Sequence, residues 1–310
     1  MNGAGRAGLA CLLLLLVARP GWAAAGSGGD APRRVGLILF SQAFRPAAEG
    51  FREGMARLGY REGRELLLDV RDIGRDLEQV PGLIREFTRK GYDLVVTTTT
   101  PVARAALAQP RGPPLLFTMV ASPLRSGLVS SLRVPGGRAS GVSHIAFETL
   151  PRRLILFKTA FPSLRRVALF HSSRLPFLKG HIEEYLRPVA NELKIELVDY
   201  PVNDTREFDA CSAAIAPGEI DGIFMLPDPI SVTMLEQLVR FSRERRLPLM
   251  VADNALLARG GVMGYSPDFH DIGVQVAGMA DRVLRGAEVG RLPVQNPWKI
   301  SLLVSVKEAR

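Results

Sequence analysis

Cysteine is scarce in this chain: among its 310 residues only Cys11 and Cys211 occur. Cys11 lies in an N-terminal segment that we expect to be removed, which leaves one thiol and no intramolecular disulfide. The apolar run from Leu9 to Val17 is too short to span a bilayer comfortably. These features exclude a disulfide-stapled scaffold and argue against a membrane span in this segment.

Motifs for catalysis are missing as well. The sequence has no Gly-x-Ser-x-Gly elbow and no phosphate loop ending in Gly-Lys-Ser or Gly-Lys-Thr. Its four histidines, His144, His171, His181 and His270, form no pair at metal-binding spacing. We therefore expect a protein that is not an enzyme and that uses no cofactor or metal.

The charge is positive but dispersed. The formal net charge is +9, and Arg6 and Arg19 of the N-terminal segment account for two, so the remainder carries 9 − 2 = +7. No dense basic tract is interleaved with aromatic residues, so nucleic-acid binding is not expected. A basic surface favours anionic ligands or an acidic partner.

Residues 1–25 have the three parts of a secretory signal peptide. Arg6 provides a positive start, Leu9 to Val17 an apolar core, and Ala23-Ala24-Ala25 a small-residue cleavage site. We expect cleavage near Ala25 and a soluble protein exported to the periplasm.

The stretch from Leu94 to Ala103 organises the rest of the chain. Leu94 to Val96 is a short apolar run typical of a central parallel strand. Thr99 or Thr100 can cap the helix that follows, and Pro101 fits its first position. The turn between strand and helix combines hydroxyls with free backbone N–H groups, which suits a carboxylate. An alternative is that the threonines only cap the helix.

Short apolar strands alternate with helical segments along the whole chain, which predicts parallel sheets with helices on both faces. The predicted fold class is α/β, with two Rossmann-like lobes and a ligand cleft between them. We assign 33–144 plus 266–288 to the first lobe and 145–265 plus 289–310 to the second. Chain crossings are expected near His144, near Tyr265, and between Arg285 and Pro293, where the lobes would bend toward each other on ligand binding.

Polar residues gather where the predicted strands end, and such residues at the carboxyl edges of two lobes describe a ligand site. A ligand carboxylate is expected at Thr99 and Thr100. Asp228 and Asp253 are the candidate acceptors for its ammonium group. Asp228, between two prolines, could also be a general base or cap the following helix, and we favour a cap or a ligand contact over catalysis. Phe40, Phe170 and Tyr265 are candidates to enclose an apolar side chain, although each can be core. The predicted site comprises Phe40, Ser41, Gln42, Thr98, Thr99, Thr100, Thr118, Val120, Ala121, Ser143, His144, His171, Ser172, Ser173, Asp228, Asp253, Asn254 and Tyr265.

Several segments also carry a family resemblance. The run from Gly50 to Arg64 resembles the "gfregL…lGyveGkn" segment of a family of exported ABC-transporter substrate-binding proteins. Further similar segments follow in the same order, so that the resemblance covers nearly all of residues 33–306. They are Val70-Arg71-Asp72, Thr99 to Ala103, Ser122 to Leu132, Pro135-Gly136-Gly137, Leu226 to Pro229, Gly260 to Tyr265 and Leu292 to Gln295.

The resemblance implies a type I periplasmic-binding fold, a small ligand held between two lobes, and delivery to an ABC permease in the inner membrane. Similar members bind aromatic or other amino acids. The family usually has Asp where this chain has Ser122. We expect a monomer. The alternative function is a periplasmic sensing module that presents ligand to a membrane receptor or sensor kinase.

Overall fold

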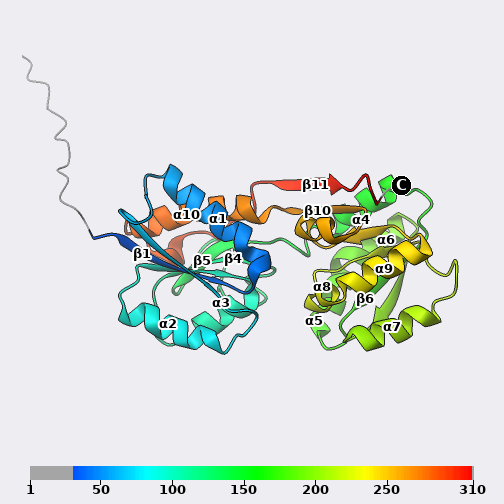
Figure 1. Cartoon of the computed structure of the whole chain (residues 1–310), viewed down its shortest axis with the longest axis horizontal. Coiled ribbons are helices and arrows are strands. Elements are labelled where there is room, and N and C mark those ends of the chain that lie inside the picture. The colour runs from blue at the N-terminus through cyan, green and yellow to red at the C-terminus, as the bar shows by residue number, and fades with distance from the viewer. Residues whose placement is uncertain (1–30, 309–310) are drawn as a thin grey trace, which may run out of the picture. The chain divides into compact units, whose positions relative to one another are not determined.

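Five parallel strands form the first sheet of the computed structural model, which describes residues 31–308 apart from the side chains of Pro176, Phe177 and Pro229. The strand order is β2-β1-β3-β4-β5 (Figure 1). The strands are β1 (Arg33–Leu39), β2 (Leu66–Asp72), β3 (Leu94–Thr98), β4 (Leu115–Val120) and β5 (Ala139–Ser143). The stretch that starts at Leu94 is therefore the central strand, as predicted.

Helices cover both faces of this sheet. One face packs against α1 (Arg45–Arg57) and α10 (Phe269–Leu284), and the other against α2 (Gln79–Arg89) and α3 (Thr100–Leu107). All five residues of β3 are buried, because a central parallel strand is covered on both sides. The short 3₁₀ turns η1 (Gln42–Phe44) and η4 (Val289–Arg291) precede α1 and follow α10.

Glycines let α1 and α10 approach each other closely. A Cβ atom on Gly273 of α10 would lie 2.1 Å from the carbonyl oxygen of Ala47, and one on Gly50 of α1 would lie 2.0 Å from that of His270. Only glycine fits such backbone contacts. This close packing fixes α10 to the first sheet although β10 and β11, its neighbours in sequence, belong to the second.

The second sheet has six strands in the order β11-β10-β9-β8-β6-β7. All pairs are parallel except β11, which runs antiparallel beside β10 at the edge. The strands are β6 (Arg166–His171), β7 (Glu196–Pro201), β8 (Gly222–Phe224), β9 (Leu249–Val251), β10 (Met263–Pro267) and β11 (Ile300–Val304). Two parallel-sheet α/β lobes confirm the predicted fold class.

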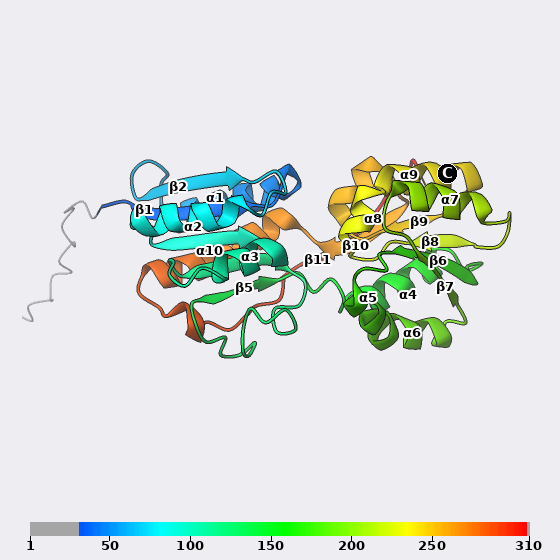
Figure 2. The ribbon, with the colours of Figure 1, turned by 90° about the horizontal axis from the view of Figure 1, so that it is seen from below.

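Two groups of helices cover this second sheet on opposite faces (Figure 2). The first group is α4 (Leu150–Ala160), α5 (Pro176–His181), the π-helical turn η2 (Ile182–Leu186) and α6 (Arg187–Glu192). The second is α7 (Thr205–Ala214), α8 (Pro229–Thr233), α9 (Leu235–Arg245) and the 3₁₀ segment η3 (Asn254–Arg259).

The chain passes between the two sheets after β5, after β10 and before β11. The third crossing corrects the assignment of 289–310 to the second lobe. Residues up to Gln295 bond to the first lobe: Gln295 N donates to Gly141 O at 2.9 Å, and Ser140 Oγ donates to Leu292 O at 2.7 Å. Only after Gln295 does the chain enter β11. The predicted crossing between Arg285 and Pro293 is therefore wrong, because hydrogen bonds to the edge strand β5 keep the end of that segment in the first lobe.

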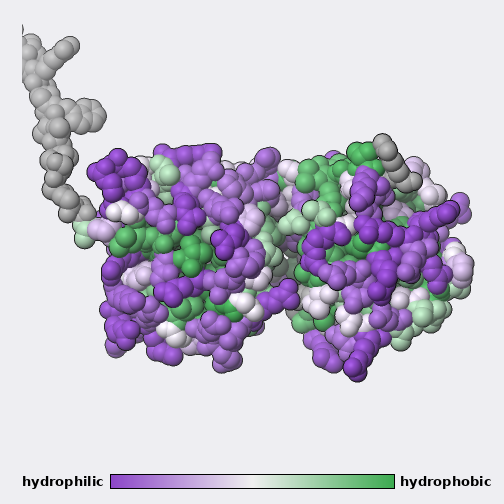
Figure 3. All heavy atoms as spheres, viewed as in Figure 1, coloured by the Kyte–Doolittle hydropathy of each residue, from purple (hydrophilic) through white to green (hydrophobic). Residues whose placement is uncertain are grey.

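The surface of the described part is mixed in character. Figure 3 shows one face, where hydrophilic side chains cover most of both lobes and hydrophobic surface lies beside the last residues. Exposed apolar side chains of β11 and its flank are Trp298, Leu302, Leu303, Val304 and Val306. Within residues 31–308, no helix has the length and apolarity to cross a bilayer. The expected signal peptide, 1–25, lies outside the described residues.

Candidate functional site

Each sheet reverses its strand order at one point. In the first sheet β1 is followed by β2 on one side and by β3 on the other, and in the second β6 is followed by β7 and β8 in the same manner. Ligands of open α/β sheets bind outside the carboxyl ends of the strands at such switch points. The residues after β1 and β3, and after β6 and β8, therefore define where the site should be sought.

Hydroxyls inside the first sheet serve the backbone. Thr98 Oγ1 accepts from Phe40 N at 2.9 Å, which joins the ends of β3 and β1 across the switch point. Thr118 Oγ1 donates to Thr97 O at 3.2 Å. Thr98 and Thr118 are both buried. Of the predicted site residues, these two therefore shape the edge of the sheet rather than offer free groups.

Thr99 has a different environment. Its φ of 69° and ψ of 154° lie in a region that is almost exclusive to glycine, and a β-branched residue there is strained. It holds the N-cap position of α3, yet its side chain makes no capping bond. Among the described residues its buried Oγ1 has no hydrogen-bond partner. The start of α3 thus combines uncapped N–H groups with an unused hydroxyl, and strain of this kind gathers at functional sites.

The neighbouring strand ends carry further strain. Met119 has a φ of 50° and lies in an irregularity of the β4–β5 ladder, and Ile145 has a φ of 49° after β5. Val120 O accepts from His144 N at 2.9 Å and from Ser143 Oγ at 3.3 Å. Bulges of this type re-aim side chains next to sites. The predicted residues Val120, Ser143 and His144 are thus brought together by one carbonyl group.

Four rings form a continuous row from the first sheet to the first crossing. Phe40 and Phe44 have centroids 6.4 Å apart, Phe44 stacks on Phe269 at 5.4 Å, and Phe269 meets His144 edge-on at 5.8 Å. Phe40 and Phe44 are half-buried, so part of the row remains accessible. Phe40 and His144 of this row were predicted as site residues from the sequence, whereas Phe44 and Phe269 were not.

His144 continues the row to an acid of the second lobe. Its Nε2 lies 3.0 Å from Oδ1 of Asp253, an ion pair when the imidazole is protonated. The angles of this contact fall outside hydrogen-bond geometry, so both buried atoms lack a hydrogen-bond partner among the described residues. Burial by itself raises the pKa of Asp253, but the charge and the polar contact of His144, together with the charge of Arg153, outweigh it and the pKa is lowered. Asp253 is therefore a carboxylate at neutral pH, with its Oδ1 buried beside His144.

Asp228 lies at the switch point of the second sheet. One of its oxygens accepts from Ser172 N at 2.7 Å and the other from Ile230 N at 3.0 Å, and the residue is 1% exposed. It is the N-cap of α8 and joins the ends of β6 and β8. Of the two roles that the sequence left open for Asp228, capping is the one its contacts support.

Comparison with known proteins shows the family to which this chain belongs. The model of the family described as ABC transporter substrate binding protein matches residues 35–310. The chain belongs to this family. A tyrosine-binding protein of Clostridioides difficile is 24% identical over 259 residues, which cover 84% of this chain and 74% of that protein.

Solved structures agree on the fold of this substrate-binding protein. A conserved domain protein from Vibrio cholerae superposes with a TM-score of 0.78 at 23% identity, covering 90% of this chain and 93% of that one. An ABC domain from Streptococcus pneumoniae in complex with L-Trp gives 0.77 at 23% identity, covering 90% and 94%. The fold is the type I periplasmic-binding fold that the sequence predicted.

Three of the remaining predicted residues of the substrate-binding protein, His171, Ser172 and Ser173, have partners in the second lobe. His171 Nε2 lies 3.3 Å from Oδ1 of Asp199, and this bond raises the pKa of His171 although burial opposes it. The hydroxyls of Ser172 and Ser173 each lie 3.1 Å from Oδ1 of Asn203. These polar groups hold the ends of β6 and β7 together.

Six further predicted positions are divided between local and core contacts. Gln42 bonds to Asp72 and accepts from Arg45, Ser41 is the half-buried residue before η1, and Ala121 packs partly against the core of the second lobe. Asn254 donates to Ser301 O at 2.8 Å, and Tyr265 pairs with Leu302 in the sheet. Phe170 is 2% exposed and stacks on Tyr200 in the core, the second of the two roles predicted for it.

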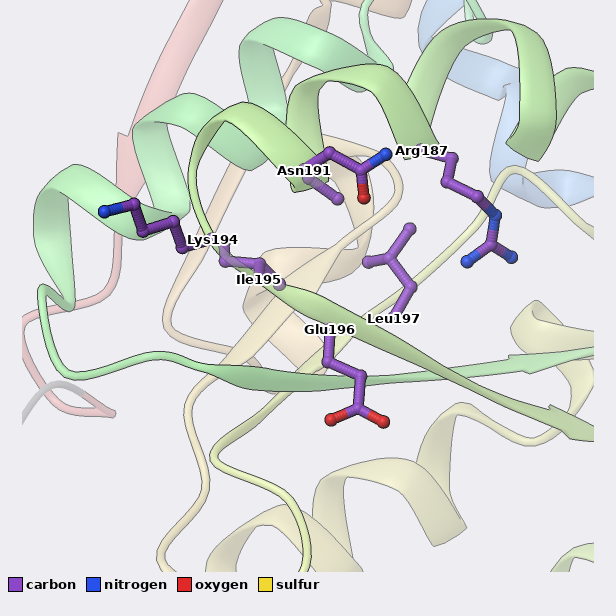
Figure 4. A pocket seen from close by; sticks show the side chains of 7 residues that line it. Arg187, Asn191, Lys194, Ile195, Glu196 and Leu197 are labelled. Carbon is purple, nitrogen blue, oxygen red and sulfur yellow. The ribbon is translucent and has the colours of Figure 1, made fainter.

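Two other features of the described part are a pocket and a group of possible metal ligands. Figure 4 shows a pocket of about 420 Å³ between α6 and the amino-terminal end of β7, opposite the carboxyl edge. Asp268, His270 and Asp271 bring potential metal ligands within 4.8 Å of one another. However, Asp268 caps α10, and Lys299 already lies 3.1 Å from Asp271. Neither feature changes the location of the candidate site.

Proposed function

We propose that this chain is the exported solute-binding component of an ABC importer and that it binds an amino acid with an aromatic side chain. The observation that carries the proposal is the uncapped start of α3 at the strained residue Thr99. Backbone N–H groups at a helix N-terminus attract anions, so this end suits the ligand's carboxylate. Delivery to an inner-membrane permease and residence in the periplasm belong to the same proposal and rest on the family and the signal-like segment 1–25.

The ammonium group of the ligand is assigned to Asp253. Its carboxylate is ionised, its Oδ1 is buried beside His144, and the residue is only half-buried, which leaves its other oxygen for the ligand. Asp228 is the weaker candidate because backbone N–H groups already occupy both of its oxygens. Charged acceptors bind an ammonium group strongly when little water remains.

The aromatic ligand side chain is assigned to the row formed by Phe40, Phe44 and Phe269. Aromatic rings pair at centroid separations like those within the row, and such pairs contribute beyond simple burial. The named relatives support the ligand class, since one is called a tyrosine-binding protein and another was solved with L-Trp.

Calorimetry with matched ligands tests each contact. We expect L-tyrosine and L-tryptophan to bind, tyramine to bind weakly because it lacks the carboxylate, and 3-(4-hydroxyphenyl)propanoate to bind weakly because it lacks the ammonium group. Each lost charge-assisted bond should weaken affinity about 10- to 150-fold. Equal affinity for tyrosine and tyramine would contradict a carboxylate site at α3.

A pair of variants separates the two acids. Asp253→Asn should weaken amino-acid binding about 10- to 150-fold. Asp228→Asn should lower the melting temperature, because an N-cap and a strand tie are weakened, with affinity near that of the wild type. The importer role is tested by uptake of the labelled amino acid in a deletion strain of the host; undiminished uptake would reject it.

A further inference from the structure

A buried arginine lies behind the acid that we assign to the ligand's ammonium group. Arg153 of α4 is 1% exposed, and its guanidinium carbon lies 4.5 Å from the ring centroid of Phe224. It forms no ion pair with a carboxylate of the described residues. Burying a cation without a direct counter-ion costs free energy that an apolar residue would not cost. Its presence therefore calls for a physical reason.

The first reason is the geometry of the strand ends. The ladder between β8 and β9 pairs Ile223 with Leu249 and Phe224 with Met250 and then stops. At that point Arg153 Nη2 donates to Met225 O at 2.7 Å and to Val251 O at 2.8 Å. One guanidinium thus bridges two strands where their own hydrogen bonds end. The loops that carry Asp228 and Asp253 begin within three residues of these carbonyls.

The second reason is charge. The groups whose charges act on Asp253 are His144, which faces its Oδ1, and Arg153. Burial lowers the pKa of Arg153 to about 10, so the guanidinium still carries its charge at neutral pH. Of the two groups, His144 lowers the pKa of Asp253 more, and the charge of Arg153 adds to its effect.

We propose that Arg153 is a positioning residue of the binding site: its buried guanidinium fixes the ends of β8 and β9 and so holds in place the loops that carry Asp228 and Asp253. The inference rests on the proposed function for the ligand group that meets Asp253. The clamp and the charge themselves are properties of the ligand-free protein. The guanidinium stays inside the lobe and does not touch the ligand.

Two variants divide the clamp from the charge. Arg153→Gln keeps an N–H donor for the strand carbonyls and removes the charge, and Arg153→Lys keeps the charge without the planar fork. Arg138→Gln is the matched control. Arg138 also donates to backbone carbonyls, those of Ala106, Gln109 and Pro113, and burial likewise lowers its pKa, but it lies in the first lobe.

The readout is the titration of the Asp253 carboxyl in the ligand-free, full-length protein, followed by carbon-13 NMR and assigned with Asp253→Asn. We expect the pKa of Asp253 to rise in Arg153→Gln, because a positive charge that lowers it is lost. Arg153→Lys and Arg138→Gln should leave it near the wild-type value. An unchanged pKa in Arg153→Gln, or an equal rise in the Arg138 control, would overturn the inference.

Binding gives a second readout. Affinity for L-tyrosine should fall as pH decreases through the pKa of Asp253, because a protonated carboxyl no longer attracts the ammonium group. In Arg153→Gln this fall should begin at a higher pH than in Arg153→Lys. If no amino acid binds the wild-type protein, the proposed function fails, while the titration of ligand-free Asp253 still decides the role of Arg153.

Discussion

Replacing Thr99 by glycine should make the empty protein more stable and should weaken its binding of the ligand. Thr99 has a φ of 69° and a ψ of 154°, a conformation that glycine adopts without strain. Its Oγ1 is buried and has no partner among the described residues, so truncation removes no hydrogen bond from the empty protein. The same hydroxyl lies at the uncapped start of α3, where we place the ligand carboxylate.

The expected magnitude follows from two opposing terms. A residue held in this backbone region stores about 1–3 kcal/mol of strain, which glycine releases. Glycine has more conformational freedom in the unfolded chain, which costs about 0.4–1 kcal/mol. The balance is a stabilisation of about 1 kcal/mol, or roughly 2 °C in melting temperature for a chain of this size. Loss of a hydroxyl bond to a charged ligand group should weaken affinity about 10- to 150-fold.

Scanning calorimetry of the empty protein and titration with L-tyrosine measure the two effects. Thr97→Val is the matched control, because Thr97 Oγ1 is also buried and unpartnered among the described residues but its backbone has ordinary strand geometry. The control should keep its affinity and should not lose stability. A lower melting temperature in Thr99→Gly would refute the strain argument, and undiminished affinity would refute the place of the carboxylate.

Three further predictions concern stability and processing. The raised pKa of His171 means that its bond to Asp199 stabilises the fold fully below the unfolded pKa of about 6.5 and less as pH rises through the folded value, so His171→Gln should lower the melting temperature at pH 5.5 but hardly at pH 9. Gly273→Ala should destabilise by about 1–3 kcal/mol in denaturant titration because its Cβ would meet α1, whereas Gly278→Ala in the same helix has open space and should stabilise by up to about 1 kcal/mol; equal effects would contradict the close packing. Mass spectrometry of the exported protein should find residues 1–25 removed near Ala25, and a mature protein that keeps Met1 would contradict this.

The sequence alone was sufficient for the fold class and for the central strand with its helix, but not for the third chain crossing. Short apolar runs followed by helical periodicity, as in Leu94 to Ala103, reappear as β3 and α3, because burial of a strand on both faces and a proline at N1 are local requirements. Cap chemistry was readable too, since Asp228 caps α8 as one of its two predicted roles.

Within the candidate site, the tertiary structure decided which polar groups are already bonded and which remain unused. Thr98 and Thr99 are neighbours of the same type, yet one hydroxyl bonds to the backbone of β1 and the other has no partner among the described residues. His144 and Asp253 lie far apart in the chain and meet because β5 and β9 both end near the first crossing. Such pairings depend on long-range packing, which no local pattern records.

Arg153 is the clearest example of what the sequence determines and what only the tertiary structure decides. Arg152 and Arg153 are identical in kind and adjacent, but Arg152 is exposed and Arg153 is 1% exposed. The helical spacing of the buried residues Leu150, Arg153, Leu154 and Phe157 places Arg153 on the inner face of α4, a signal that the sequence analysis missed. What surrounds its charge there, two strand carbonyls and a nearby carboxylate, follows only from the packing of α4 against the sheet, because the energy of a buried charge is set by partners that other segments supply.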